Sequence, residues 1–433
     1  MALVEIANVT VLPDSNGSLK EFEISSPDAG TSRDIYAITV EGCVVPTEGP
    51  PKALVVGAPG ERGPRWRLPL NVPRPDVASR HEDLQWSARC GFRDLISVTQ
   101  LPKDFDLHVV VQLPNEQLLN VAAITGHRHS LPPGPDSRFQ PVMVTSLGRT
   151  GGTWAMLLLD QHPEITGFRP FDYEPRVGSY WSDVFHVLAE PRSYQQFLHS
   201  EMRGMHWWMG RNLAPPPQQT LDPTVEEWLG SGYIDELIGV IKGRIDAFYG
   251  KVAESLAKPT IKYFAEKCGP GATVQPLFWE IYPEAREIFL VRDFRDMAAS
   301  MLAYGKKRGY QFFGREKFSS DEDYLHGLRL DAQLLLDQWN ERSSSGCLLK
   351  YEDLMRDPVE ALSSLLSYIG VDSDHRVVEK MIHDASQANV HKQNVHRTSS
   401  GGEESIGRWQ SLDEPLQRAS QEAFGDILAA FGY

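Results

Sequence analysis

A glycine-rich segment at residues 145–154, Thr-Ser-Leu-Gly-Arg-Thr-Gly-Gly-Thr-Trp, has the composition of a loop that binds a phosphate-sized anion. It follows an apolar run at residues 142–145, which predicts a short strand, and a helical pattern begins at Trp154. In a strand–loop–helix unit, backbone N–H groups and the helix N-terminus point at one place and stabilise an anion there. Arg149 adds a positive charge to the loop. We therefore predict an anion-binding loop; the alternative is an ordinary turn that carries a surface arginine.

The same loop differs from the nucleotide-binding loop of P-loop kinases. That loop ends in Gly-Lys-Ser or Gly-Lys-Thr, and its lysine reaches the terminal phosphates of a triphosphate. In this chain residues 151–153 read Gly-Gly-Thr, so no lysine stands there. The loop therefore suits a single phosphate-sized group better than a magnesium triphosphate, and a small-molecule kinase is the less favoured alternative.

A second segment with potential chemistry runs from residue 288 to residue 300. An apolar run there predicts a buried strand that ends at Arg292, and Ser300 follows about two turns into the next helix. A guanidinium group and a hydroxyl group at the carboxyl end of a strand can bind a second anion. The alternative is that Arg292 pairs with the carboxylate of Asp296 and that Ser300 lies on the helix surface.

In this order, the two segments resemble the cofactor-binding motifs of the sulfotransferase family, whose sulfuryl donor is 3′-phosphoadenosine 5′-phosphosulfate (PAPS). The family's phosphosulfate loop has the form S-x-P-[KR]-[ST]-G-[TG]-[TS]-W, and residues 146–154 match it except that Gly148 replaces the proline. Arginine also stands where lysine is commoner. The family's 3′-phosphate motif, an arginine with a serine eight residues later, matches Arg292 and Ser300. The resemblance extends over roughly residues 141–415.

The resemblance implies that the chain transfers a sulfuryl group from PAPS, used as a co-substrate, to a hydroxyl group, and that no metal ion is required. It implies that the loop and Arg149 hold the 5′-phosphosulfate and that Arg292 and Ser300 hold the 3′-phosphate. Trp154 and Tyr351 are expected against the adenine. The residues that it assigns to the co-substrate are Arg149, Thr150, Gly151, Gly152, Thr153, Trp154, Arg292, Ser300, Tyr351, Arg397 and Arg408. The last two are alternatives for closing the pocket, because the Arg-Lys-Gly that often precedes the family's C-terminal Gly-x-Trp is missing here.

The base that accepts the proton of the attacking hydroxyl must be found outside these motifs. In the sulfotransferase family it is either a histidine well after the phosphosulfate loop or a glutamate that follows the loop more closely. Glu174 lies 25 residues after Arg149 and is the expected base. His199 and His206 are the histidine alternatives, and the expected catalytic residues are therefore Arg149, Glu174 and His206. In the competing interpretation, Glu174 only forms a salt bridge with Arg176.

Residues 1–131 predict an all-β, sandwich-like accessory domain, because short β-rich runs alternate there with turns rich in glycine and proline. The runs lie at residues 35–40, 53–56, 107–112 and 119–124. A Pro-Pro-Gly-Pro sequence predicts a linker over residues 132–140. Residues 141–433 form the predicted sulfotransferase domain.

Within this domain, strand-like apolar runs alternate with helical patterns. The alternation predicts an α/β fold, with a parallel sheet and helices on both faces, and the family resemblance makes it a P-loop-kinase-like fold. The predicted strands are residues 142–145, 287–291 and 347–350, and the predicted helices are residues 154–161, 234–248, 325–339 and 359–369. Ligands of such sheets bind at the carboxyl ends of the strands, where both anion motifs lie.

The composition narrows the choice of partners. With 43 Lys and Arg residues against 58 Asp and Glu residues, the chain has a formal charge of −15, which disfavours a nucleic-acid partner. No Cys-x-x-Cys pair, secretion signal or membrane span is evident, so we expect no metal site, no integral membrane association and a cytoplasmic location. Aromatic surfaces suit a small-molecule, lipid-like or glycan acceptor, and the tryptophans expected on the acceptor side are Trp181, Trp207, Trp208 and Trp228. A non-catalytic protein that binds a nucleotide or a glycan is the remaining alternative, and the oligomeric state is open.

Overall fold

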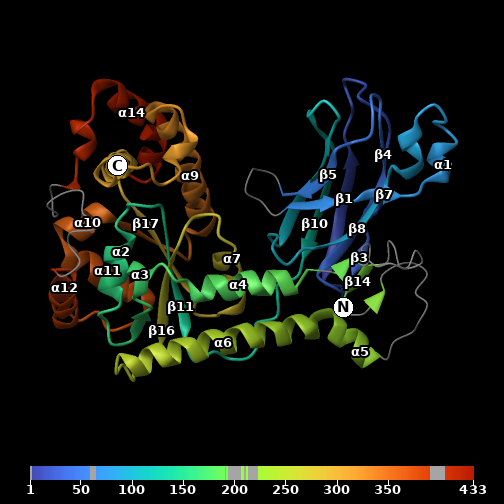
Figure 1. Cartoon of the computed structure of the whole chain (residues 1–433). Coiled ribbons are helices and arrows are strands. Elements are labelled where there is room, and N and C mark those ends of the chain that lie inside the picture. The colour runs from blue at the N-terminus through green and yellow to red at the C-terminus, as the bar shows by residue number, and fades with distance from the viewer. Residues whose placement is uncertain are drawn as a thin grey trace. The chain divides into compact units, whose positions relative to one another are not determined.

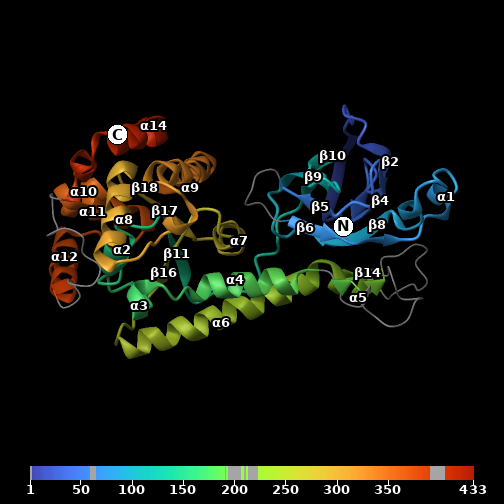
Figure 2. The ribbon, with the colours of Figure 1, turned by 45° about the horizontal axis from the view of Figure 1, so that its top comes forward.

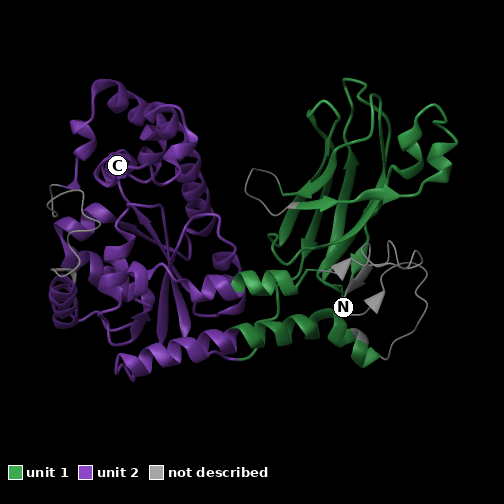
Figure 3. Ribbon diagram, viewed as in Figure 1, with its two compact units in different colours: residues 1–135, 182–241 green, residues 136–181, 242–433 purple. Residues whose placement is uncertain are grey.

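The computed structural model describes residues 2–58, 65–190, 192–193, 206–208, 211–212, 223–390 and 405–433. They fall into two compact units, shown in Figure 3: unit 1 contains residues 1–135 and 182–241, and unit 2 contains residues 136–181 and 242–433.

The boundary after residue 135 lies inside the predicted linker. Residues 182–241, however, group with the N-terminal strands, whereas the sequence places them in the domain of residues 141–433. This segment contacts the N-terminal strands, since Nε1 of Trp66 donates to the carboxylate of Glu190 at 3.3 Å. Helices α4 (Val177–Leu188) and α6 (Tyr233–Ser255) are each divided between the two units.

Unit 1 is built mainly from two antiparallel sheets (Figure 1), with the strand orders β3-β1-β10-β9-β5-β6 and β2-β4-β8-β7. Side chains alternate between buried and more exposed positions along β9, as expected for a strand with one face on a core. The antiparallel, β-rich character predicted for the N-terminal region is therefore confirmed. The strands are β1 (Val4–Val11), β2 (Leu19–Ser26), β3 (Ser32–Arg33), β4 (Ala37–Pro46), β5 (Ala53–Gly57), β6 (Arg65–Leu68), β7 (Leu70–Val72), β8 (Gly91–Ser97), β9 (Asp104–Gln112) and β10 (Leu118–Arg128).

Smaller elements complete unit 1. A three-stranded sheet consists of β13 (Arg192–Ser193), β14 (His206–Trp208) and β15 (Arg211–Asn212). The short helices are α1 (Pro75–Ala78) and α5 (Pro223–Glu227).

Unit 2 contains a five-stranded parallel sheet with the order β12-β16-β11-β17-β18 (Figures 1 and 2). The sequence predicts β11, β17 and β18, but it misses β16, which pairs directly with the central strand β11. The predicted parallel α/β architecture is nevertheless confirmed. The strands are β11 (Gln140–Ser146), β12 (Ile165–Gly167), β16 (Tyr263–Cys268), β17 (Arg286–Val291) and β18 (Cys347–Lys350).

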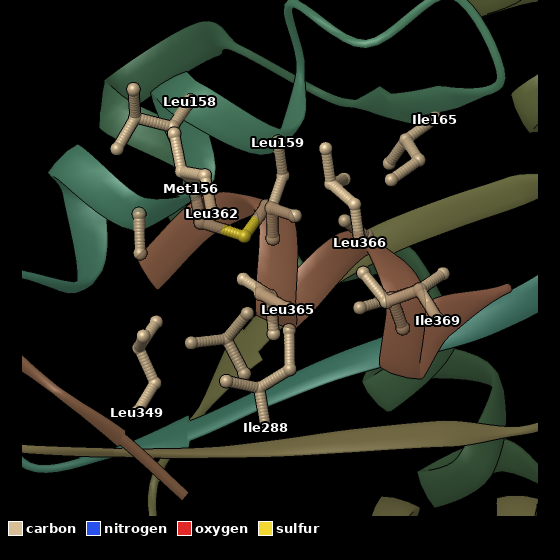
Figure 4. Close-up of a cluster of buried hydrophobic side chains, with 14 of the residues drawn as sticks. Met156, Leu158, Leu159, Ile165, Ile288, Leu349, Leu362, Leu365, Leu366 and Ile369 are labelled. Carbon is tan, nitrogen blue, oxygen red and sulfur yellow. The ribbon is translucent and has the colours of Figure 1, made fainter. Parts of the chain in front are cut away.

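Helices cover both faces of this sheet, and the alternation of side chains along β17 explains why. Ile288 and Leu290 belong to one buried cluster, together with α2 (Gly152–Leu159), α11 (Pro358–Ile369) and α12 (His375–Val390). Phe289 and Val291 belong to a second cluster, with α8 (Phe294–Arg308), α9 (Asp321–Arg342) and α14 (Glu414–Ala430). Figure 4 shows the first cluster, in which side chains of α2, α11, β17 and β18 gather. Each large apolar side chain buried in this way stabilises the fold by about 1.5–3 kcal/mol.

The remaining helices of unit 2 are short: α3 (Pro170–Tyr173), α7 (Val274–Ile281) and α10 (Tyr351–Arg356). Helix α6 has 23 residues, but charged side chains recur along it. Among the described residues, no helix combines the length and the apolar composition needed to cross a membrane. The cytoplasmic location stays a prediction.

Candidate functional site

The predicted anion-binding loop connects β11 to α2, at the carboxyl end of the central strand. Gly151 precedes the helix with a φ of 97°, and a Cβ atom there would lie 2.4 Å from Cδ2 of Tyr351, so only glycine fits this position. Thr150 is buried, and its hydroxyl donates a hydrogen bond of 2.7 Å to the carbonyl of Leu147, which closes the loop. The N–H group of Trp154 donates to the carbonyl of Gly151 at 2.9 Å, whereas the first two residues of a helix, here Gly152 and Thr153, have no carbonyl one turn earlier. An anion bound by these two N–H groups stays a prediction.

The structure brings the two predicted anion motifs together at this loop. Nε of Arg149 donates to Oγ of Ser300 at 3.2 Å, and Nη1 of Arg292 donates to the main-chain carbonyl of Arg149 at 3.0 Å. Ser300 is buried on α8, so the alternative that it lies on the helix surface is wrong. Burial lowers the pKa of Arg149, and the positive charge of Arg292 lowers it further. Two guanidinium groups held this close favour a bound anion.

The alternative interpretation expects Arg292 to form an ion pair with Asp296. The contacts that the structure shows for Arg292 are with other residues. Its Nη2 donates to the carbonyl of Ser405 at 2.5 Å, and its guanidinium carbon lies 4.7 Å from the ring centre of Tyr351. Asp296 instead accepts two main-chain N–H groups of a C-terminal turn. Nε of Arg292 is buried and has no hydrogen-bond partner among the residues that the structure describes. A buried charged donor without an acceptor is unfavourable, so this atom indicates where a ligand oxygen would bind.

The C-terminal Gly-Arg-Trp element places a further cation near Arg292. Arg408 begins the 3₁₀ helix η6 (Arg408–Ser411). Burial lowers the pKa of Arg408, and the charge of Arg292 lowers it further, whereas the carboxylate of Asp296 acts in the opposite direction. The carbonyl of Ser405, three residues before Arg408, accepts a hydrogen bond from Arg292, so Arg408 follows a turn that contacts Arg292 directly. Arg397, the other candidate for closing the pocket, lies outside the described residues.

The two aromatic residues expected at the adenine lie close to the loop. Trp154, in the first turn of α2, is partly buried and packs against the cluster between α2 and α11. Tyr351 begins α10, and its ring contacts the position where a side chain at Gly151 would project. Its hydroxyl lies 3.0 Å from Oγ of Ser405. A role of either ring at the adenine stays a prediction.

Glu174 is joined to the loop through a lysine that the sequence analysis misses. Oε1 of Glu174 lies 2.7 Å from Nζ of Lys267, and the same Nζ donates to Oγ1 of Thr153 in the first turn of α2 at 3.2 Å. Arg176 also pairs with Glu174 at 3.2 Å, as the competing interpretation expects. Burial acts to raise the pKa of Glu174, but the hydrogen bond and charge of Lys267 and the charge of Arg176 lower it overall. The side chain is therefore a carboxylate at neutral pH.

Lys267 supplies the loop with an ammonium group that the loop sequence itself lacks. It is buried at the carboxyl end of β16, and its register partner is Val144 of β11. The sequence does contain a feature that could indicate Lys267: a Glu-Lys pair directly follows Tyr-Phe-Ala at residues 263–265. Charged residues at the end of an apolar run suit the ligand-binding edge of a parallel sheet, so this pair could have identified both the strand and the cation.

A short left-handed turn sets the position of Glu174. Residues 171–173 have φ values of 50°, 59° and 64°, which are unfavourable for residues other than glycine by roughly 1–2 kcal/mol each. The buried carboxylate of Asp160 stabilises the turn, because its Oδ2 accepts the hydroxyl of Tyr173 at 3.1 Å and Nε of Arg169 at 2.9 Å. Backbone strain that is maintained by its surroundings is common at functional sites.

The profile of the sulfotransferase family matches residues 141–375, which is more than half of the chain. The chain belongs to the sulfotransferase family. The matched residues include both anion motifs, Glu174, Lys267 and Tyr351. The resemblance stated from the motifs is therefore confirmed.

Proteins that are named as sulfotransferases are similar to this chain. Carbohydrate sulfotransferase 3 of Mus musculus is 30% identical over 171 residues, which are 37% of this chain and 36% of that relative. The chain thus matches only about a third of the length of this curated relative. Among solved structures, sulfotransferase STF9 from Mycobacterium avium aligns with a TM-score of 0.35 and 14% identity over 69% of this chain and 78% of that chain. Mouse sulfotransferase SULT7A1 complexed with PAP aligns with a TM-score of 0.37 and 13% identity over 68% and 86%.

The structure does not describe the side chains of the histidines that are the alternative candidates for the base. His199 and the side chain of His206 lie outside the described residues. The backbone of His206 belongs to β14 in unit 1, whereas Glu174 belongs to unit 2. The expected catalytic role of His206 stays a prediction.

Within the described ranges, one set of side chains in unit 1 has the donor atoms that a metal ion needs. The donor atoms of Glu21, Glu23 and Cys43 lie within 4.8 Å of one another. Arg74 pairs with Glu23 at 3.0 Å, and Arg80 pairs with Glu21. These guanidinium groups already neutralise both carboxylates.

Proposed function

We propose that the chain is a PAPS-dependent sulfotransferase that sulfates a hydroxyl group of a glycan. The observation that carries the proposal is the meeting of Arg149, Arg292 and Ser300 at the N-terminus of α2. One site thereby offers groups for two separate phosphates, which PAPS has at its 5′ and 3′ positions. The similarity to a carbohydrate sulfotransferase supports the glycan as acceptor.

The residues present fit the donor. Nε of Arg292, which is buried and has no partner among the described residues, offers a hydrogen bond to a phosphate oxygen, and Arg408 adds charge just after the turn that Arg292 contacts at Ser405. At the other phosphate, Arg149 and the N-terminus of α2 supply positive charge, and Gly151 lets the ring of Tyr351 pack directly against the loop. A kinase is less well supported, because residues 151–153 lack the lysine that a triphosphate loop requires.

The chain's own side chains divide the work of the transfer. Glu174 accepts the proton of the acceptor hydroxyl, whose oxygen forms the new bond to sulfur while the bond from sulfur to the phosphate oxygen breaks. Lys267 and the first turn of α2 stabilise the negative charge that the leaving phosphate gains. Arg149 contributes charge but no proton, because a guanidinium group stays protonated at all accessible pH values.

The proposal is tested by transfer of radiolabelled sulfate from PAPS to a panel of oligosaccharides, phenols and lipids with free hydroxyl groups. We expect transfer to oligosaccharides without added magnesium. We also expect adenosine 3′,5′-bisphosphate (PAP) to stabilise the protein by about 2.7 kcal/mol at one hundred times its Kd, seen as a rise in Tm, whereas ATP has no comparable effect. Stabilisation by magnesium ATP without stabilisation by PAP would instead indicate a kinase, and PAP binding without transfer to any acceptor would indicate a binding protein.

Replacing Arg292 with Ala should weaken PAP binding far more than binding of adenosine 5′-phosphosulfate, which has no 3′-phosphate. A charge-assisted hydrogen bond to a phosphate contributes about 1.5–3 kcal/mol, so Kd for PAP should rise by about one to two orders of magnitude. Calorimetric titration of both nucleotides provides the measurement. Arg329→Ala is the control, because Arg329 pairs with Asp426 between α9 and α14 at 2.6 Å. An equal loss for both nucleotides in Arg292→Ala would mean that Arg292 stabilises the fold rather than the 3′-phosphate.

A further inference from the structure

One face of α8 carries a carboxylate between the two groups assigned to the 3′-phosphate. Asp296 and Ser300 are four residues apart, so they lie one above the other on the same face of α8. Arg292 lies four residues before Asp296, just before the helix begins. Both Asp296 and Ser300 are buried. Neither the family motifs nor the proposed mechanism gives Asp296 a role.

Both carboxylate oxygens of Asp296 are used to hold a turn 111 residues further along the chain. Oδ2 accepts the main-chain N–H of Gly407 at 2.7 Å, and Oδ1 accepts the main-chain N–H of Trp409 at 2.9 Å. Gly407 has a φ of 76°, which turns the chain sharply before Arg408. The carboxylate therefore binds the turn on both sides of Arg408.

The turn is also connected to the ligand groups. The carbonyl of Ser405 accepts Nη2 of Arg292, and Oγ of Ser405 lies 3.0 Å from the hydroxyl of Tyr351. Arg295, next to Asp296 on α8, lies with its guanidinium carbon 4.2 Å from the ring centre of Trp409. Moving this turn would therefore change the surroundings of Arg292 as well as the position of Arg408.

We propose that Asp296 is a positioning residue, which holds residues 405–409 so that Arg408 and Arg292 act together on the 3′-phosphate. The proposal rests on the proposed function and deepens it. A carboxylate is the side chain required, because it offers one acceptor oxygen to each N–H group. Asparagine offers one oxygen and directs its NH₂ group at the second N–H, so it cannot hold both ends of the turn.

The first test is Asp296→Asn, with Kd measured for PAP and for adenosine 5′-monophosphate, which lacks the 3′-phosphate. We expect Kd for PAP to rise by about tenfold or more, while Kd for the monophosphate changes by less than about twofold. Asp246→Asn is the matched control, because Asp246 also accepts two main-chain N–H groups, those of Arg138 and Phe139, elsewhere in unit 2. It should lower Tm without changing the ratio of the two Kd values. An unchanged ratio in Asp296→Asn, with or without a lower Tm, would overturn the proposal.

Two further measurements keep the proposal testable if Asp296→Asn folds poorly. Arg408→Ala leaves the turn attached to Asp296 but removes the guanidinium group that the turn positions. Its Kd for PAP should therefore rise as in Asp296→Asn, with little change for the monophosphate. An unchanged Kd for PAP would overturn the proposal. In the absence of nucleotide, trypsin should cleave after Arg408 faster in Asp296→Asn than in the wild type or Asp246→Asn, and equal rates would overturn it. A wild-type protein that binds no PAP would instead contradict the proposed function, whatever the trypsin result.

Discussion

Replacing Glu174 with Gln is expected to slow turnover by about 10²–10⁴-fold at saturating PAPS, whereas the affinity for PAP should change little. Glutamine has the size of glutamate and still accepts a hydrogen bond from Lys267, but it cannot take the proton of the acceptor hydroxyl. The measurements are kcat for transfer of radiolabelled sulfate and Kd for PAP. Comparison at saturating donor separates the loss of a base from any change in nucleotide binding.

Glu254→Gln is the matched control for this variant. Glu254 pairs with Lys251 at 2.9 Å on the exposed surface of α6, so the same change there removes a carboxylate from an exposed surface pair. Its turnover should stay within about twofold of the wild type. If Glu174→Gln kept wild-type turnover while His199→Ala or His206→Ala lost it, the base would be that histidine and the contacts of Glu174 would be structural.

The strands and helices that the sequence predicts are those whose apolar pattern is not interrupted. β17 and α11 are examples: β17 is a short apolar run that is buried along almost its whole length, and the buried positions of α11 follow the helical period of about 3.6 residues. β16 escapes prediction because it ends in the buried charges of Glu266 and Lys267. The carboxylate of Glu266 accepts the N–H of Gly178 and the hydroxyl of Tyr249, both at 2.6 Å. These partners are distant in sequence, so a local pattern contains no information about them.

The same distinction separates the site residues. Arg149, Arg292 and Ser300 can be identified from the sequence because each lies in a short motif with fixed spacing. The motifs assign no role to Lys267 or Asp296, whose contacts with the site join residues 114 and 111 positions apart. A charged residue beside a strand end indicates a polar site, but its partner is determined only by the fold.

Replacing Lys267 with Met should lower turnover by about 10²–10³-fold, because the ammonium group stabilises charge that develops only as the donor bond breaks. Methionine is similar in length and apolar, so it can fill the buried space that the lysine stem occupies. The loop keeps Arg149 and the N-terminus of α2, and the affinity for PAP should therefore fall much less than kcat. Steady-state kinetics with PAPS and titration with PAP provide both quantities.

The pH dependence of this variant distinguishes a catalytic role from a structural one. In the wild type, the hydrogen bond and charge of Lys267 help to keep the pKa of Glu174 low, against the effect of burial, which raises it. Without Lys267 the pKa of Glu174 should rise. Because the base works only when ionised, the acid limb of the kcat profile should move to higher pH, so that activity is lost at pH values where the wild type is still fully active. Lys267→Arg keeps the charge, and its acid limb should stay close to that of the wild type.

Lys242→Met controls for the loss of a buried ammonium group in unit 2. Nζ of Lys242 donates to the carbonyl of Ile281 at 3.0 Å and lies 4.9 Å from the ring centre of Tyr282, and the side chain is buried, as that of Lys267 is. This variant should lower Tm and leave the acid limb in place. Should Lys267→Met behave in the same way, with wild-type kcat and an unchanged profile, Lys267 would serve only to support the loop, and the charge on the leaving phosphate would be stabilised by Arg149 and the N-terminus of α2.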